Sequence, residues 1–258
     1  MSTPLTFLHI PVDLKALYRM NDKRAWAAAR NFDEGRALHH VMGEIFGKKS
    51  LQPFRLLVPP RKRTGSLYAY SLLPADQLND TGRTCAPELE AVLDPAAMRA
   101  KSLATDFAAG RRLGFDIRIC PVRRTDREGN RNASREIDAF LHEALRHGDD
   151  KNWMKNNNRT REAVYTDWLA ERLGGAASLQ PGTTRLARFR RTIKARDKPK
   201  TLDHKPKLES PDAVLHGTLT VTNSAAFAEK LCHDIGRHKA YGFGMILLRP
   251  PGQQPLTR

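Results

Sequence analysis

The chain has 258 residues, enough for one large domain or two small ones, and its 40% hydrophobic and 28% charged content suits a soluble globular protein with long exposed segments. No apolar stretch approaches the roughly 18 residues that a membrane span needs, and the N-terminus lacks the charged head and apolar run of a secretory signal. Cys85, Cys120 and Cys232 lie far apart without paired spacing, which favours reduced thiols in the cytoplasm over a disulfide framework.

The charge is the most informative part of the composition. Lysine and arginine total 44 against 28 acidic residues, which gives a net charge of +16 and a pI near 10.2. Such an excess repels itself unless a polyanion offsets it, so nucleic acid is the leading partner and an anionic membrane surface the second. A basic protein without a polyanionic partner is the third interpretation.

The positive charge is concentrated in two segments. Residues 185–207 hold ten lysines or arginines and two aspartates, and residues 111–135 hold eight arginines and three acids. Arginine supplies all eight basic residues of 111–135 and five of the ten in 185–207, and its planar fork suits phosphate and base edges. Each segment could alternatively be a solvated loop.

Hydrophobic spacing predicts the elements of the first part of the chain. Leu38, Val41, Met42 and Ile45 keep the spacing of one buried helix face, and Gly47 closes that helix. A basic hairpin tip is expected over residues 59–65. Strand, helix, helix, strand and strand are expected in that order over residues 6–12, 16–29, 34–46, 54–58 and 67–73.

The later elements repeat this order. Residues 83–112 read as a connection whose best helical piece is 94–101, and Ser134 and Ser224 are the expected caps of two helices. Residues 148–158 read as a loop and 180–211 as a long basic arm. Strands are expected over 114–122, 214–221 and 245–248, and helices over 135–146, 160–173 and 225–232.

This order predicts an α+β fold of two tandem ferredoxin-like (RRM-like) βαββαβ units with a basic helical and loop insertion. The first domain would span residues 1–110. The second would span 111–258, with the insertion at about 148–211 and a glycine-rich loop at 236–244.

The glycine-rich loop has the composition of an anion cradle. Gly236, Gly242 and Gly244 permit close backbone approach, and Arg237 and Lys239 add charge. It contains no Walker motif, and a strand rather than a helix follows it, which excludes a dinucleotide fingerprint. A plain turn is the alternative.

With the preceding helix and the short apolar strand that follows, this loop resembles that of the CRISPR repeat-processing endoribonucleases, above all the CasE (type I-E) subgroup, with the processing enzymes of type IV systems as related alternatives. Three further stretches, residues 115–118, 165–169 and 216–221, are similar to a central strand, a Trp-Leu helix and a penultimate strand of that group. The chain departs from the pattern at Asp234, where glycine is common.

The resemblance implies RNA cleavage without a metal or another cofactor, in which the 2′-OH attacks the adjacent phosphate. The catalytic histidine of the family falls on His39, with His40 as the alternative and Arg36 on the same side of the helix. Arg24, Arg30 and Arg36 are the candidates if basic residues act instead. The sequence itself offers no zinc motif and no carboxylate cluster.

RNA, as a CRISPR repeat hairpin, and other subunits of a CRISPR effector complex are the expected partners, and no membrane is expected. The alternatives are a non-catalytic RNA-binding subunit of the same fold and a ribosome-associated or other basic RNA protein. The expected RNA-binding residues are Arg24, Arg30, Arg188, Arg190, Arg191, Lys194, Arg196, Gly236, Arg237, His238, Lys239, Gly242 and Gly244.

Overall fold

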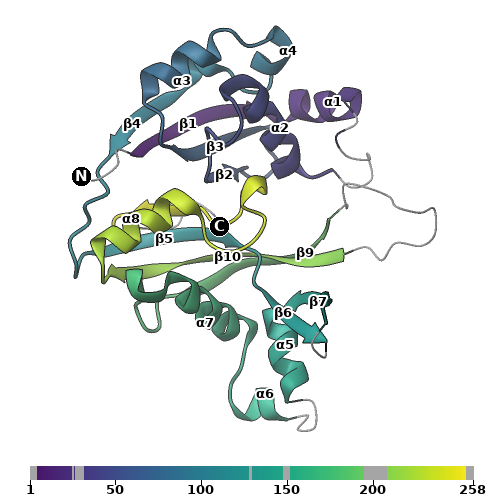
Figure 1. Ribbon diagram of the computed structural model, residues 1–258, viewed down its shortest axis with the longest axis vertical. Coiled ribbons are helices and arrows are strands. Elements are labelled where there is room, and N and C mark those ends of the chain that lie inside the picture. Colours follow the sequence, from purple (N-terminus) through teal and green to yellow (C-terminus); the bar gives the residue numbers. More distant parts are fainter. Residues whose placement is uncertain are drawn as a thin grey trace, which may run out of the picture.

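The computed structural model describes residues 5–24, 26, 32–127, 130–147, 152–194 and 208–253. They form two sheets with their helices, one above the other in Figure 1, and a small β-hairpin with two helices beside the lower sheet. Among these residues, no helix is long and apolar enough to cross a bilayer.

The first sheet has the strand order β2-β3-β1-β4 with every neighbouring pair antiparallel, which is the order of a ferredoxin-like unit. Its elements are β1 (Leu5–Asp13), α1 (Leu14–Arg24), α2 (Glu34–Phe46), β2 (Phe54–Leu57), β3 (Thr64–Ser71), α3 (Ala75–Gly82), α4 (Pro87–Glu90), η2 (Pro95–Ala97) and β4 (Arg99–Leu103).

The second sheet repeats this topology with the order β11-β5-β10-β8, and β9 also pairs with β10. The prediction of two ferredoxin-like units is therefore confirmed. Its elements are β5 (Arg112–Ile119), β6 (Val122–Arg127), β7 (Asn130–Asp138), α5 (Ala139–Arg146), α6 (Trp153–Asn156), α7 (Arg161–Leu173), η3 (Gly174–Ala176), β8 (Ala177–Leu179), β9 (Arg185–Lys194), β10 (Leu208–Val221), α8 (Ser224–His233), η4 (Lys239–Tyr241) and β11 (Ile246–Arg249).

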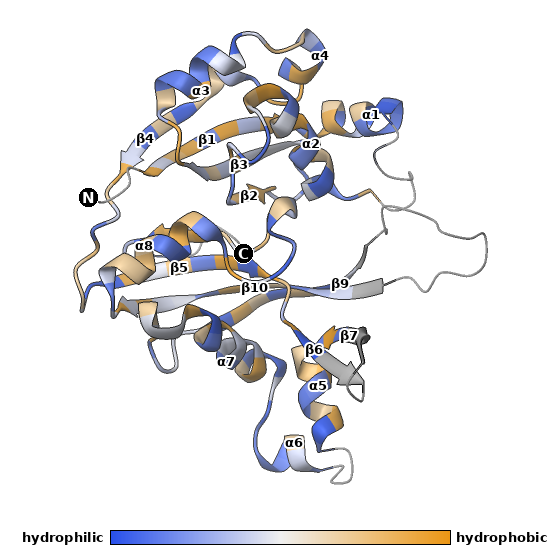
Figure 2. Ribbon diagram, in the orientation of Figure 1, coloured by the Kyte–Doolittle hydropathy of each residue, from blue (hydrophilic) through white to orange (hydrophobic). Residues whose placement is uncertain are grey.

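Alternation along the strands decides which sheet face is covered by helices. In β1, Leu8 and Ile10 are fully buried against Leu38 and Val41 of α2, while His9 between them points to the other face. Figure 2 shows β1 mostly in hydrophobic colours, whereas α3 alternates along its length, as burial of one helix face requires.

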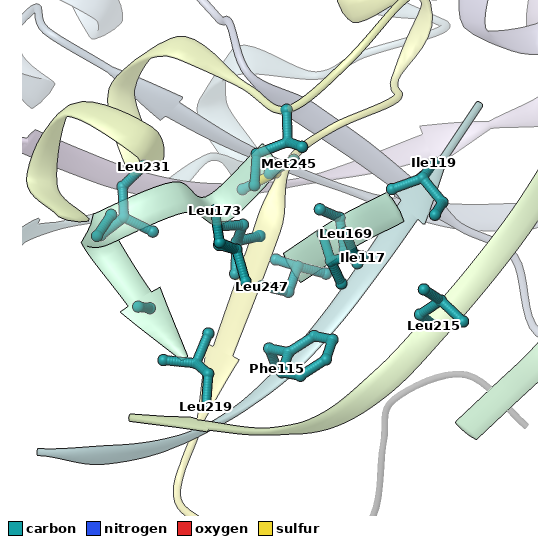
Figure 3. Packing of buried hydrophobic residues seen from close by; sticks show 14 of the residues in the cluster. Phe115, Ile117, Ile119, Leu169, Leu173, Leu215, Leu219, Leu231, Met245 and Leu247 are labelled. Carbon is teal, nitrogen blue, oxygen red and sulfur yellow. The ribbon is translucent and has the colours of Figure 1, made fainter. Parts of the chain in front are cut away.

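The second sheet buries its apolar face in the same way. Figure 3 shows Leu169 and Leu173 of α7 beside Phe115 and Ile117 of β5, with Leu231 of α8 in the same cluster. Each sheet thus has a core on its helical face, and its opposite face remains available for the other sheet.

Two sequence expectations in the connection and hairpin regions were wrong. Residues 94–101 are not helical, because Pro95 begins a single 3-10 turn and Arg99 then enters β4, which pairs with the open edge of β1. The helix expected from Ser134 begins only after Asp138, whose carboxylate accepts from the Phe140 N–H at 2.9 Å, because the preceding residues pair with β6.

The basic arm expected over residues 180–211 is also wrong for its described parts. Arg185–Lys194 forms β9, which pairs with an extended β10 that begins at Leu208. The many arginines and the prolines of this segment hid its strand pattern in the sequence. In addition, Asn223 rather than Ser224 caps α8, since its side chain accepts from the Ala226 N–H.

The free faces of the two sheets meet at a buried ion pair. The Arg55 Nη2 of β2 donates to the Asp116 Oδ1 of β5 at 3.2 Å, and the two side chains are 2% and 1% exposed. Nearby, the Tyr70 hydroxyl donates to the Ile246 carbonyl at 2.9 Å. Burial lowers the pKa of Arg55 to about 10, although Asp116 opposes that shift.

Asp116→Asn should therefore lower the free energy of unfolding by about 3 kcal/mol or more, because it leaves a buried guanidinium without a counter-charge. Chemical denaturation would measure the loss. Asp80→Asn is the control, since Asp80 pairs with Arg83 at the surface and should cost less than about 0.5 kcal/mol. Equal effects of the two substitutions would contradict a structural role for the buried pair.

Candidate active site

The candidate histidines lie on α2, whose ends are as the sequence predicts. Asp33 is the N-cap and accepts from the Arg36 N–H at 3.2 Å, and Gly47 follows the last turn with φ 88°. His39 and His40 lie at the margin of the buried face and are both partly exposed. The His40 ring stacks on Trp26 with centroids 5.0 Å apart, and the two histidine rings meet edge-on at 5.7 Å.

The glycine-rich loop is held in place by its own backbone. Gly236, Gly242 and Gly244 all have positive φ, and an added Cβ at Gly244 would lie 2.4 Å from the Ile235 carbonyl oxygen. The Gly244 N–H donates to the Arg118 carbonyl at 2.7 Å, which ties the loop to β5.

The loop crosses from the second half of the chain to α2 in the first half. An added Cβ at Gly35 would lie 2.2 Å from the Tyr241 carbonyl oxygen, so only glycine permits this approach. The Tyr241 ring then stands edge-on to His39, with centroids 5.9 Å apart and an interplanar angle of 87°. Residues from both halves thus assemble the surroundings of His39.

Burial controls the charge of His39. Partial burial is the main cause that lowers its pKa from the ordinary 6.5, and the neighbouring His40 charge acts in the same direction. His39 is therefore neutral at pH 7, the form that can accept a proton.

A cleft of about 660 Å³ opens beside this site, between the free faces of the two sheets. Gly35 and Tyr241 line it, together with the buried Arg55 and the three further arginines Arg118, Arg188 and Arg190. Pairing brings these arginines together, because Arg118 lies opposite Val214, and Val214 lies opposite Arg188.

One buried carboxylate organises two of the arginines. Asp212 is fully buried and accepts from Arg118 Nε and Nη2 at 2.8 Å each and from Arg190 Nε at 2.6 Å. Hydrogen bonds and charge from Arg118 and Arg190 depress the pKa of Asp212 far below its ordinary value, even though burial opposes the shift. Within the described residues, the exposed Arg188 side chain makes no hydrogen bond or ion pair.

The other predicted basic residues are spread over several surfaces. Arg24 at the end of α1 pairs with Glu88 and lies 3.7 Å from Glu44. Arg237 pairs with Glu136 at 2.7 Å. Lys239 donates to the carbonyls of His233 and Asp234, which closes the end of α8. His238 has a left-handed φ of 60° and its ring faces Tyr241.

The cleft includes only part of the predicted RNA-binding set. Gly242, Arg188 and Arg190 line it. Arg191, which is exposed, also lies on β9, as does the backbone of Lys194. Arg30 and Arg196 lie outside the described residues. Arg36 lies one turn before His39 on α2, partly exposed.

Sequence reasoning missed Tyr241, Arg118 and Asp212. Tyr241 was visible in the loop, but no local pattern predicts its contact with His39. Arg118 could have been noticed in the sequence because it is a charged residue between two apolar residues of the strand β5. In the part of the chain that the structure describes, no group of three histidine, cysteine, aspartate or glutamate residues is placed to hold a metal ion.

Comparison with known proteins gives the family. Residues 16–250 match the family described as CRISPR associated protein, and the chain belongs to that family. No curated protein matches the sequence.

Solved structures agree with the fold. A CRISPR endoribonuclease Cse3 bound to a 19-nucleotide RNA superposes with a TM-score of 0.60 at 15% identity, covering 97% of this chain and 100% of that chain. Cse3 of Thermus thermophilus, bound to an RNA representing a pre-cleavage complex, gives 0.57 at 15% identity, with 95% and 99% covered. Cas6e from Escherichia coli str. K-12 gives 0.50 at 17%, with 95% and 99% covered.

The contact between α2 and the loop predicts opposite effects for two glycines of one helix. Gly35→Ala should lower the free energy of unfolding by about 1–3 kcal/mol, because the methyl group would displace the Tyr241 backbone. Gly43→Ala is the matched control, since an added Cβ there meets nothing within 4 Å. It should raise stability by up to about 1 kcal/mol through helix propensity. A stabilising Gly35→Ala would contradict the contact.

Proposed function

We propose that this protein is a metal-independent endoribonuclease that binds precursor CRISPR RNA and cuts it at repeat hairpins. The observation that carries the proposal is the placement of a neutral, half-buried His39 beside an arginine-lined cleft between two ferredoxin-like sheets. Membership of the CRISPR associated family and a fold shared with Cse3 endoribonucleases support it.

The chemistry follows from the protonation state of His39. A neutral imidazole takes the proton of the RNA 2′-OH, and the 2′ oxygen attacks the adjacent phosphorus. The bond to the 5′ oxygen then breaks, which leaves a 2′,3′-cyclic phosphate on one product and, after proton transfer, a 5′-OH on the other. Arg36 on the same helix is our candidate for stabilising the charge on the phosphate, with His40 as the alternative base.

The cleft and the loop would hold the RNA. Arg188 is the cation of the cleft most available to a phosphate, whereas Asp212 already engages Arg118 and Arg190. Lys239 and Arg237 would act mainly by shaping the loop, given their intramolecular partners. After cleavage the protein would keep its product as a subunit of an effector complex. Two kinds of similar structure support binding of RNA and of effector subunits. One is Cse3 bound to RNA, and the other is a CRISPR RNA-guided surveillance complex with a TM-score of 0.53 and 18% identity. A cytoplasmic location is consistent with this role.

The direct test incubates the purified protein with a labelled repeat hairpin in EDTA. We expect cleavage with a cyclic-phosphate end, and a loss of at least about 100-fold in His39→Ala, the usual contribution of an acid–base group. His40→Ala tests the alternative base at the adjacent position, and it should keep most of the activity if His39 takes the proton. Binding without cleavage would favour a non-catalytic RNA-binding subunit, and no preference for the hairpin would favour a general RNA-binding protein. Equal activity of His39→Ala and wild type would disprove the assignment to His39.

The pH profile tests the protonation state. Because burial and His40 lower the pKa of His39 below 6.5, the base remains available as the pH falls through neutrality. Cleavage should therefore decline only below pH 6.5. In His40→Ala the decline should move to higher pH, since the repulsion between the two rings is gone.

A further inference from the structure

The tip of the hairpin between β2 and β3 has no role in the proposed cutting chemistry. Residues 58–63 connect the two strands, and they include the three consecutive cations Arg61, Lys62 and Arg63. All three residues are exposed, and none of their side chains makes a hydrogen bond or an ion pair to another described residue. Exposed cations that have no counter-charge in the protein favour contact with a polyanion.

The backbone of this hairpin tip is held in place by hydrogen bonds. The Lys62 N–H donates to the Pro59 carbonyl at 3.2 Å across a turn in which Arg61 has a left-handed φ of 63°. The Arg63 carbonyl accepts from the Leu14 N–H at 2.9 Å, which ties the tip to the start of α1. Because the backbone is already ordered, the three cations are presented to a ligand without the cost of ordering a loop.

The hairpin tip also forms part of the wall of the cleft between the two sheets. Val58, Pro59 and Pro60 line the cleft, and Val58 is 39% exposed. The second sheet contributes Arg188 and Arg190 to the same cleft. An exposed apolar surface therefore lies next to the three cations of the tip, and further arginines come from the other half of the molecule.

This combination suits a single strand of RNA better than a duplex. The bases of a single strand can lie on exposed apolar side chains while its phosphates meet the cations. In an A-form stem the bases are paired and stacked inside the helix, so the apolar part of the tip would have no base to cover it. The cleft volume of about 660 Å³ suits a few nucleotides of one strand and not both strands of a stem.

We infer that the hairpin tip binds a single-stranded segment of RNA beside the repeat hairpin, with Arg61, Lys62 and Arg63 contacting its phosphates and Val58 and the two prolines contacting its bases. The inference deepens the proposed function and rests on it in taking RNA as the ligand. It assigns the single-stranded part of that RNA to a surface separate from His39.

The test measures binding of two RNA probes to the full-length protein by fluorescence anisotropy over a series of salt concentrations. One probe is a single strand of about 12 uridines, and the other is a blunt hairpin without flanking nucleotides. Both probes carry 2′-O-methyl groups and therefore lack the 2′-OH that cleavage requires. Binding can thus succeed or fail independently of the proposed cutting activity.

The double variant Arg61→Gln, Lys62→Gln should lower the salt dependence of binding to the single strand. Each lost phosphate contact to a single strand reduces the slope of log K against log salt by about 0.7, so the slope should fall by about 1.4. The affinity for the single strand should fall by about tenfold at low salt. The affinity for the blunt hairpin should stay close to that of the wild type.

The matched control is the double variant Lys48→Gln, Lys49→Gln. These two exposed lysines are also consecutive, and Lys49 has a left-handed φ of 66°, so both variants remove the same charge from the same kind of backbone. The two lysines follow the C-terminal end of α2, whereas Gly35 at its other end lines the cleft. The control should bind both probes as the wild type does.

Three results would overturn the inference. The first is an equal loss of single-strand binding in the two double variants, which would indicate a general effect of net charge. The second is a larger loss for the blunt hairpin than for the single strand, which would assign the tip to a duplex. The third is unchanged binding of the single strand by the Arg61→Gln, Lys62→Gln variant, or no binding of it by the wild type.

Discussion

The contact between Arg55 and Asp116 joins the two halves of the molecule at a point that water does not reach. A buried ion pair contributes little net stability compared with apolar packing, but it costs several kcal/mol to break, and it therefore penalises any arrangement that separates the partners. The free faces of the two sheets are held opposite each other as a result. Because the cleft lies between these faces and the glycine-rich loop reaches from one half to the other, both depend on how the two sheets face each other.

The proposed active site is a product of this arrangement. His39 belongs to the first half of the chain and Tyr241 to the second, and they meet only because Gly35 lets the loop backbone approach α2. Asp212 similarly fixes Arg118 and Arg190 from neighbouring strands. Fixed donors and cations need little reorganisation during a reaction, which is the property that phosphate chemistry requires.

Features that depend on neighbouring residues in the chain were predicted from the sequence, whereas features that depend on contacts between distant residues were missed. The bounds of α2 followed from the periodicity of Leu38 to Ile45 between Asp33 and Gly47, and the glycine-rich loop from its composition. By contrast, β4 is polar and mostly exposed, and only the edge of β1 makes it a strand. The charged face of β9 likewise concealed its pairing with β10. Arg55 looks like any outward residue of a strand until Asp116 is placed opposite it.

The most direct test of this assembly is single-turnover cleavage of a repeat hairpin by Tyr241→Ala at saturating RNA. The account predicts a rate reduced by about tenfold or more with unchanged RNA affinity, because misplacement of a reacting group slows chemistry without weakening binding. Tyr241→Phe keeps the ring that contacts His39 and should cleave at nearly the wild-type rate. A Tyr241→Ala variant that cleaves as fast as wild type would contradict the claim that the loop positions His39.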